Sequence, residues 1–313
     1  MRYIRQKTFP KLKGKQEIIS QAKVCIIGCG ATGTLAAELL TRTGVKELIL
    51  IDRDLIELNN LQRQTLFTEK DVEKPKVIIA KEKLNEINSE VEITSHFLDL
   101  DYTNINLINS DLILDCTDNL QTRFLINDYA HKNKTPWIFS AVLGDKGYIK
   151  VFNNKECFQC IFSEVQGLDT CETGGILNTT INFVVSAQVT EAFKILTKQE
   201  FTKELIAFNV WDLKINKIKI NPKKDCPACN NNYEYLEGKK EPEIITYCSG
   251  NNFQIKGQFD YDQIKNKLKN ITTRETPYFI KIENMTIFKD NRVLIHAQDK
   301  TKAKSLYAKY IGT

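Results

Sequence analysis

A glycine-rich turn between an apolar strand and a helix constrains this chain more than any other feature. Val24 to Gly28 is a short apolar run typical of a buried parallel strand, and Gly28-Cys29-Gly30-Ala31-Thr32-Gly33 follows at once. A helical stretch with leucines on one face comes next, and Gly44 is placed to end it. Such a turn lets backbone N–H groups approach a phosphate, and the helix N-terminus adds about half a positive charge. The sequence therefore begins as a nucleotide-binding α/β fold.

Strands and helices alternate after this turn. We expect strands at 48–52, 91–97 and 111–116, with helices from Pro75 to about Asn88 and from Asn119 to Lys132. This alternation predicts a doubly wound, Rossmann-like, mostly parallel sheet. Beyond Pro136 we expect antiparallel strands to continue the sheet, at 137–142, 147–152, 205–210 and 214–220, with a long apolar helix at 178–198. The fold class is α/β.

The polar segment that follows marks a domain boundary. The sequence predicts one large domain at 1–230, a linker at 231–243, and a small C-terminal α+β module at 244–313. In the module, helices are expected at 259–268 and 302–310 and strands within 278–293.

Composition excludes several classes of protein. No run approaches the roughly 18 apolar residues that a membrane span needs, and residues 1–16 lack the apolar core of a secretory signal. The net charge of +5 is mild and the lysines are dispersed, so we expect a basic surface and no nucleic-acid partner. We therefore expect a cytoplasmic protein, in which nine cysteines indicate metal binding, redox or nucleophilic roles instead of disulfides.

The residues after the second strand indicate which nucleotide is bound. Asp52 stands where a ribose hydroxyl is held, about 20 residues beyond the turn, and this much equally fits an NAD(P)-dependent oxidoreductase. Arg63 and Lys76 then add fixed cations, which a triphosphate and its pyrophosphate leaving group need. Asp118 follows a buried strand at the edge where open α/β sheets bind ligands, and its carboxylate suits Mg²⁺.

At this point the chain resembles the ThiF/MoeB/HesA and ubiquitin-activating E1-like adenylating enzymes. The resemblance covers about residues 1–230, in the order and spacing of that family. It rests on these segments: Arg2 to Gln6, Gly28 to Gly33, Asn60 to Gln64, Lys74 to Lys76, Leu114 to Asn119 and two Cys-x-x-Cys pairs. One departure is Ala31, where the family commonly has glycine.

The resemblance implies a role for each matching residue. Gly30 and Ala31 would lie against the nucleotide, Asp52 would bind the ribose, and Asp118 would support Mg²⁺ and the reacting carboxylate. The residues expected to bind ATP are Gly28, Gly30, Ala31, Gly33, Asp52, Asn59, Asn60, Arg63, Gln64, Lys76 and Asp118. The residues expected to take part in catalysis are Arg63, Lys76, Asp118, Arg5 and Cys171. Arg5 would act in the site of the other subunit of a homodimer.

The cysteines divide into a predicted metal site and a predicted nucleophile. Cys157, Cys160, Cys226 and Cys229 form two pairs with metal-knuckle spacing, and four thiolates fill a tetrahedral Zn²⁺ site completely, which makes the site structural. The long stretch of sequence between the pairs makes this prediction weaker than it would be for a compact zinc ribbon. The resemblance supports it, because that family has both pairs at these positions. Cys171 lies in a polar, glycine-containing loop before a long helix and matches the family's acyl-accepting or sulfur-transferring cysteine.

The predicted function is ATP-dependent adenylation of the C-terminal glycine carboxylate of a small ubiquitin-like or sulfur-carrier protein ending in Gly-Gly. A sulfurtransferase or a conjugating enzyme would be a further partner. Three alternatives stay open from the sequence: an ATP-dependent tRNA-modifying dehydratase of the same superfamily, an NAD(P)-binding oxidoreductase, and a non-catalytic scaffold on this fold.

Overall fold

The computed structural model describes residues 2–153, 156–162, 175–246 and 251–312. They form two compact units, Met1–Lys240 and Glu241–Thr313, each with a hydrophobic core of its own. Within the described residues, none of the helices has the length and apolar character that a membrane crossing requires.

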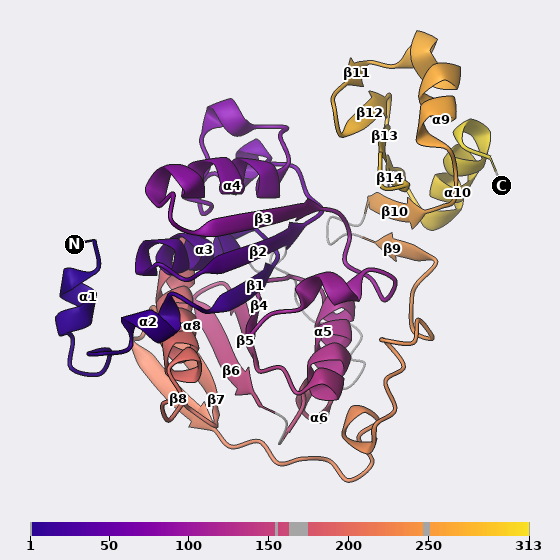
Figure 1. Cartoon of the computed structure of the whole chain (residues 1–313). Helices are drawn as coiled ribbons and strands as arrows, with labels where there is room; N and C mark the ends of the chain where they lie inside the picture. Colours follow the sequence, from indigo (N-terminus) through magenta and orange to yellow (C-terminus); the bar gives the residue numbers. More distant parts are fainter. Residues whose placement is uncertain (1, 154–155, 163–174, 247–250, 313) are drawn as a thin grey trace. The chain divides into compact units, whose positions relative to one another are not determined.

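An eight-stranded sheet is the centre of the first unit (Figure 1). Its strands are β1 (Lys23–Ile27), β2 (Glu47–Asp52), β3 (Glu92–Phe97), β4 (Leu112–Asp115), β5 (Trp137–Leu143), β6 (Lys146–Phe152), β7 (Leu205–Asn209) and β8 (Lys214–Ile218). They lie in the order β3-β2-β1-β4-β5-β6-β7-β8. Strands β1 to β5 pair in parallel, and β6 to β8 continue the sheet antiparallel. The predicted doubly wound sheet with an antiparallel continuation is confirmed.

Helices cover both faces of this sheet because successive strand residues point to opposite sides. On β1, Val24 and Ile26 join the core shared with α3, α4 and α8, whereas Cys25 and Ile27 join the core shared with α5. The helices of this unit are α1 (Ile4–Thr8), α2 (Gln16–Ile19), α3 (Ala31–Thr43), α4 (Lys76–Ile87), α5 (Leu120–Asn133), α6 (Phe158–Ile161) and α8 (Asn178–Leu196). Both layers are therefore filled.

The helix ends carry the residues that the sequence indicated. Gly44 follows α3 in the left-handed conformation at φ +79°, a backbone state that glycine adopts without a steric penalty. The Asn119 side chain caps α5 by accepting a hydrogen bond from the Thr122 backbone N–H at 2.8 Å. These two caps fix where the helices that flank the nucleotide turn begin and end.

The direction in which successive strands are added to the sheet reverses beside β1, and this reversal determines where a ligand can bind. After β1 the chain runs outward through β2 and β3 and then returns to the other side of β1 to form β4 and β5. Ligands of open α/β sheets bind at the carboxyl ends of the strands that flank such a reversal. The glycine turn follows β1 and Asp118 follows β4, so both lie at that edge.

The second unit is a six-stranded antiparallel sheet with two helices. Its elements are β9 (Ile244–Thr246), β10 (Asn252–Lys256), α9 (Tyr261–Leu268), β11 (Arg274–Glu275), β12 (Phe279–Ile282), β13 (Met285–Phe288), β14 (Arg292–His296) and α10 (Lys300–Tyr310). The strand order is β11-β12-β13-β14-β10-β9. This is the α+β module that the sequence predicted, with Asp260 capping α9 and Asp299 capping α10.

The structure contains elements that the sequence analysis did not expect, among them α6 and strands β9 to β11. Helices α1 and α2 were not expected, and α1 has no buried residue that would give an apolar pattern. The segment expected to be a linker, 231–243, packs on the first unit over part of its length. Tyr235 stacks on Phe124 of α5 with ring centroids 4.8 Å apart, and the first unit extends to Lys240.

Candidate nucleotide site and cysteine cluster

Two glycines of the turn are required by close packing of the backbone. Gly28 has φ +90°, and a Cβ atom there would lie 2.5 Å from the backbone oxygen of Cys116. A Cβ on Gly33 would lie 1.8 Å from the backbone oxygen of Gly28. Any side chain at either position would push α3 or the end of β4 away from β1.

Gly30 differs, because a side chain there would meet no backbone atom. The nearest described atom to a Cβ built there is the Gln64 Nε2 atom, at 3.8 Å, which is an ordinary van der Waals contact. Gly30 is the N-cap of α3 and offers no side chain to the first backbone N–H groups of that helix. These N–H groups therefore have no side-chain cap, and such a helix N-terminus suits a phosphate. Ala31 begins α3 directly after it.

Gln64, whose side chain lies next to Gly30, carries a buried polar atom without a partner. The residue is 3% exposed, and its Oε1 atom makes no hydrogen bond in the structure. Buried polar atoms in folded proteins are almost always hydrogen-bonded, so an unpartnered one indicates a ligand or water. Together with the uncapped N-terminus of α3, it is the observation that fits a bound nucleotide.

Asp52 lies at the end of β2 and contacts the backbone of the glycine turn. Its two carboxylate oxygens accept hydrogen bonds from the backbone N–H groups of Cys29 and Asp54, each at 2.6 Å. Burial raises the pKa of Asp52 to about 6, although the nearby Lys76 cation acts in the opposite direction. The carboxylate is ionised at neutral pH and is held rigidly beside the nucleotide turn.

This pKa gives a pH prediction. In its predicted role an ionised Asp52 would accept hydrogen bonds from ribose hydroxyls, and protonation would remove that capacity, so ATP affinity should fall as pH drops through about 6. If the protonated form does not bind, ATP affinity measured by calorimetry should be about tenfold weaker at pH 5 than at pH 7. The variant Asp52→Asn should bind weakly with no such change between pH 5 and 7. A wild-type affinity that is flat over this interval would contradict the role.

Lys76 is a buried cation surrounded by carboxylates. Its Nζ atom lies 2.9 Å from Asp54 Oδ2, and the residue is 7% exposed at the start of α4. Burial by itself lowers the pKa of Lys76, but the charges of Asp54, Asp52 and Asp118 together raise it well above its usual range. Lys76 is therefore charged at all physiological pH values, and Asp118 is near enough to contribute.

The segment after β2 contains a 3₁₀ turn, η1 (Leu58–Asn60), which carries Asn59 and Asn60 and precedes Arg63. Asn60 is buried, and its side chain donates to Asn59 Oδ1 at 2.6 Å and accepts from the Glu57 N–H at 3.2 Å. Arg63 donates to the Asn59 backbone oxygen at 2.9 Å and remains half-buried. The turn thus presents amide and guanidinium groups next to Gln64.

The loop that carries Asp118 is anchored by an ion pair that the sequence interpretation missed. Asp115, at 0% exposure, accepts from Arg123 Nε at 3.0 Å and from both the backbone N–H and the hydroxyl of Thr117. Arg123 also donates to the backbone oxygens of Thr117 and Ser140. A charged residue in the apolar strand Leu112–Asp115 was the available signal, because a buried carboxylate needs a partner. Asp118 itself is exposed at the end of this loop.

Three thiols lie beside the nucleotide turn and are buried. Cys25, Cys29 and Cys116 are 0%, 0% and 7% exposed. Burial raises the pKa of Cys116 to about 12 and raises the pKa of Cys25 and Cys29 further. These side chains are protonated core residues.

Arg5 lies near the amino ends of the parallel strands, whereas the residues described so far lie at the carboxyl ends. Helix α1 is attached through Tyr3, whose hydroxyl donates to Glu90 and accepts from Asn88, both at 2.9 Å. Asn88 and Glu90 precede β3, at the amino ends of the strands, so the length of a strand, about 20 Å, separates α1 from the carboxyl edge. Helix α1 lies at the amino ends of the neighbouring strands (Figure 1). Arg5, which α1 carries, is exposed and does not join the site of its own chain.

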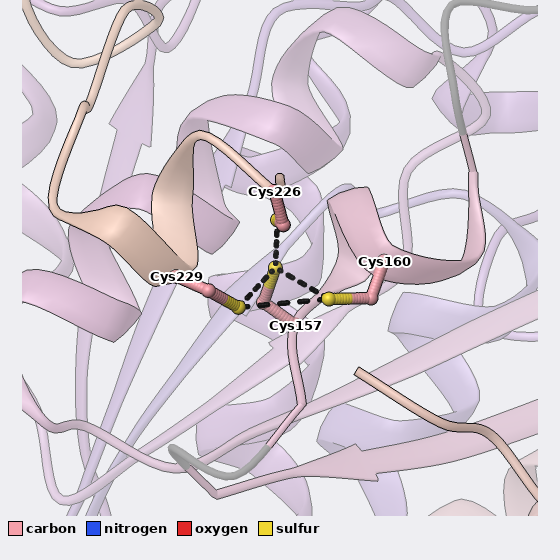
Figure 2. Close-up of side chains that lie close together, drawn as sticks. All are labelled: Cys157, Cys160, Cys226 and Cys229. Carbon is pink, nitrogen blue, oxygen red and sulfur yellow. Dashed lines mark hydrogen bonds between the residues drawn. The ribbon is translucent and has the colours of Figure 1, made fainter. Parts of the chain in front are cut away.

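The four predicted metal-ligating cysteines converge, although their pairs lie far apart in the chain (Figure 2). The Sγ atom of Cys157 lies 3.7 Å from that of Cys160, 3.3 Å from that of Cys226 and 3.5 Å from that of Cys229. The Sγ atoms of Cys160 and Cys229 are 3.5 Å apart. A Zn–S bond of about 2.3 Å in a tetrahedron sets sulfur atoms about 3.8 Å apart.

This arrangement therefore fits a tetrahedral ion bound by four sulfurs. Burial and the neighbouring sulfurs raise the pKa of Cys157 and Cys229, the latter to about 12. A divalent cation would reverse this effect by deprotonating the thiols. We call Cys157, Cys160, Cys226 and Cys229 the cysteine clip.

The profile of the ThiF family matches residues 3–228. This chain belongs to the ThiF family. The predicted relationship is confirmed, and the match covers the whole nucleotide site and the first three cysteines of the clip.

Among curated ThiF-family relatives, a sulfur carrier protein ThiS adenylyltransferase from Bacillus subtilis (strain 168) is 34% identical over 333 residues, covering 99% of both proteins. The protein of the same name from Escherichia coli (strain K12) is 32% identical and covers 73% of this chain and 94% of that protein. An adenylyltransferase and sulfurtransferase MOCS3 from Danio rerio is 32% identical, but the match spans only 52% of its length.

Solved structures with this fold include E. coli MccB with selenomethionine MccA, at a TM-score of 0.65 and 24% identity over 74% of each chain. E. coli MccB with ATP aligns at a TM-score of 0.62 and 24% identity over 68% of each chain. At this identity the likeness concerns the fold of the ThiF-type unit.

Most of the sequence-predicted site residues of this ThiF-family chain lie together. The carboxyl edge of β1, β2 and β4 gathers Gly28, Gly30, Ala31, Gly33, Asp52, Asn59, Asn60, Arg63, Gln64, Lys76 and Asp118. Arg5 lies apart from them, and Cys171 falls outside the described residues.

Proposed function

We propose that this chain is an adenylyltransferase that activates the C-terminal carboxylate of a small sulfur-carrier or ubiquitin-like protein with ATP. The family membership and the names of its relatives support adenylation. The observation that carries the proposal is the buried, charged Lys76 among three carboxylates, together with the unpartnered oxygen of Gln64, whose side chain lies next to Gly30. A cation fixed at this position suits a triphosphate.

The proposed reaction needs no proton transfer in its first step. A carboxylate oxygen of the carrier attacks the α-phosphorus of ATP and forms an acyl–phosphate bond, while the bond from that phosphorus to the bridging oxygen breaks. The electron pair leaves with pyrophosphate. Lys76 and Arg63 would offset the charge that develops on the phosphates, so the chain contributes positioning and electrostatics. Mg²⁺ held by Asp118 would supply further charge neutralisation.

Pyrophosphate exchange tests this function directly. With Mg²⁺ and a Gly-Gly-terminated carrier, the enzyme should incorporate labelled pyrophosphate into ATP, because formation of the acyl-adenylate is reversible. Removing the last two glycines of the carrier should abolish the exchange. Exchange that needs no carrier but is stimulated by tRNA would favour the dehydratase, and binding of a nicotinamide dinucleotide instead of ATP would favour the oxidoreductase. Either result would overturn the proposal.

We further propose a homodimer in which Arg5 completes the site of the partner subunit. Support comes from the position of α1 at the strand edge opposite its own nucleotide site. Arg5→Ala and Asp118→Asn should each remove most of the activity. After subunit exchange between the two variants, half of the symmetric dimers are mixed and carry one intact site, so about a quarter of wild-type activity should return. No recovery would show that Arg5 does not act in trans.

The cysteine clip is proposed to bind a structural Zn²⁺ ion, because its sulfur spacing fits such a site and four sulfurs leave no position for substrate. The free thiols of the described residues suit a reducing compartment, and we place the enzyme in the cytoplasm. Cys171 is proposed to accept the acyl group, alone or with a sulfurtransferase or conjugating partner.

We propose that residues 244–313 dock the carrier or a downstream protein. Support comes from the E. coli relative, which carries the same name as the B. subtilis relative but is matched almost completely by 73% of this chain. A chain ending at Lys240 should keep carrier-independent ATP binding and show a raised KM for the carrier. An unchanged KM would exclude docking by this module.

A further inference from the structure

Three polar side chains connect helix α5 to both halves of the cysteine clip. Asn127 and Asp128 lie on α5 at 1% and 0% exposure, and Gln159 lies between the cysteines of the first pair. We infer that these three side chains are positioning residues that preset the two cysteine pairs for metal binding. The inference rests on the proposed zinc site.

Asn127 orients the first cysteine pair. Its Oδ1 atom accepts from the Phe158 backbone N–H at 2.7 Å. Phe158 begins α6 directly after Cys157, which is the N-cap of that helix. A strong hydrogen bond at this amide fixes the direction in which the chain leaves Cys157, and so the direction of its thiol.

Asp128 and Gln159 connect the first pair to the second. Asp128 Oδ1 accepts from Gln159 Nε2 at 3.2 Å, and Gln159 Oε1 in turn accepts from the Ala228 backbone N–H at 3.3 Å. Ala228 lies between Cys226 and Cys229. Asp128 Oδ2 also accepts from the backbone N–H groups of Tyr235 and Leu236, just beyond the second pair.

This network is more than ordinary packing would require. Asp128 is 0% exposed, and its carboxyl group accepts hydrogen bonds from neutral amides of the described residues. Such a polar group is costly to bury where an apolar residue could fill the same volume. Cys157 and Cys226 are 69 residues apart, so local sequence alone cannot hold the pairs together before the ion binds. Hydrogen-bonded groups behind metal ligands provide such preorganisation.

The variants Asn127→Ala and Gln159→Met test the inference in the full-length protein. Asn133→Ala is the matched control, because it changes an asparagine of the same helix whose side chain donates to the Tyr129 backbone oxygen within α5. Zinc release to an excess of chelating dye should be about tenfold faster or more in the two test variants, and unchanged in the control. Co²⁺-substituted protein should show a perturbed d–d absorption spectrum in Asn127→Ala.

Thermal unfolding separates positioning from simple loss of stability. A positioning role predicts that the gain in Tm between metal-free and zinc-loaded protein shrinks in both test variants. Equal lowering of both Tm values, with zinc release at the wild-type rate, would overturn the inference and leave the zinc site intact. If the wild-type protein itself binds neither zinc nor Co²⁺, the zinc proposal is wrong and the inference falls with it, whereas carrier-dependent pyrophosphate exchange is judged separately.

Discussion

Replacing Asp118 by asparagine should lower kcat for pyrophosphate exchange by about 10²–10³-fold, the loss typical when one preorganised charge-stabilising group is removed from an active site. Asp118 is exposed at the end of the loop after β4, and its charge acts on Lys76, so the fold should tolerate the change. The Mg²⁺ concentration that supports half-maximal exchange should also rise.

The control for this prediction is Asp212→Asn. Asp212 is also an exposed aspartate, paired loosely with Lys214 at 3.8 Å beyond β7 and remote from the glycine turn. Its replacement should leave exchange unchanged. If Asp118→Asn retains wild-type exchange and Mg²⁺ dependence, the site does not use this carboxylate and the proposed chemistry fails.

Replacing Arg123 by methionine should destabilise the first unit by about 3–5 kcal/mol, because removing one partner of a buried ion pair leaves the other charge uncompensated. The charge left without its partner would be that of Asp115, which is 0% exposed. Its Oδ2 atom lies 3.0 Å from Arg123 Nε in the intact protein. Arg123 also loses its hydrogen bond to the Thr117 backbone oxygen, so the loop that carries Asp118 should become mobile. Urea unfolding and hydrogen exchange of that loop measure the two effects.

Arg42→Met provides the comparison. Arg42 pairs with Glu38 one turn away on α3, but its side chain is 58% exposed, so its loss should cost less than about 1 kcal/mol. Adding Asp115→Leu to Arg123→Met should recover part of the lost stability without restoring exchange. Similar unfolding curves for Arg42→Met and Arg123→Met would show that the buried pair does not stabilise the fold.

The centre of the sheet could be predicted because β1, β2 and β4 are buried on both faces. Each of these parallel strands contains a short, continuous apolar run, as at Cys25 to Ile27 or Leu112 to Leu114, which sequence alone distinguishes from its surroundings. The glycine turn was predictable for a related reason. Gly28 and Gly33 meet backbone atoms that exclude any side chain, so the requirement is visible in the residue type itself.

The missed features depend on contacts between distant residues. In the sequence, Arg123 is one charged residue within a predicted helix. Its role appears only in the fold, where β4 and β5 bring Asp115 and the Ser140 carbonyl beside it. Tyr235 belongs to the polar segment 231–243, whose composition predicted a linker. Its burial arises from stacking on Phe124 of α5. Helix α1 buries none of its residues, so no periodicity marks it. The opposite-edge position of Arg5 likewise follows only from the fold.

The protonated state of Cys29 and Cys116 has a chemical consequence for the proposed intermediate. A mixed carboxylic–phosphoric anhydride is a strong electrophile, and a thiolate within reach would capture it before any intended acceptor. Burial keeps the pKa of both thiols far above neutrality, so neither presents a nucleophilic sulfur at the end of β1 or β4. The glycine turn can thus contain cysteine without self-acylation, and the activated tail of the proposed intermediate would stay available for an acceptor supplied from elsewhere.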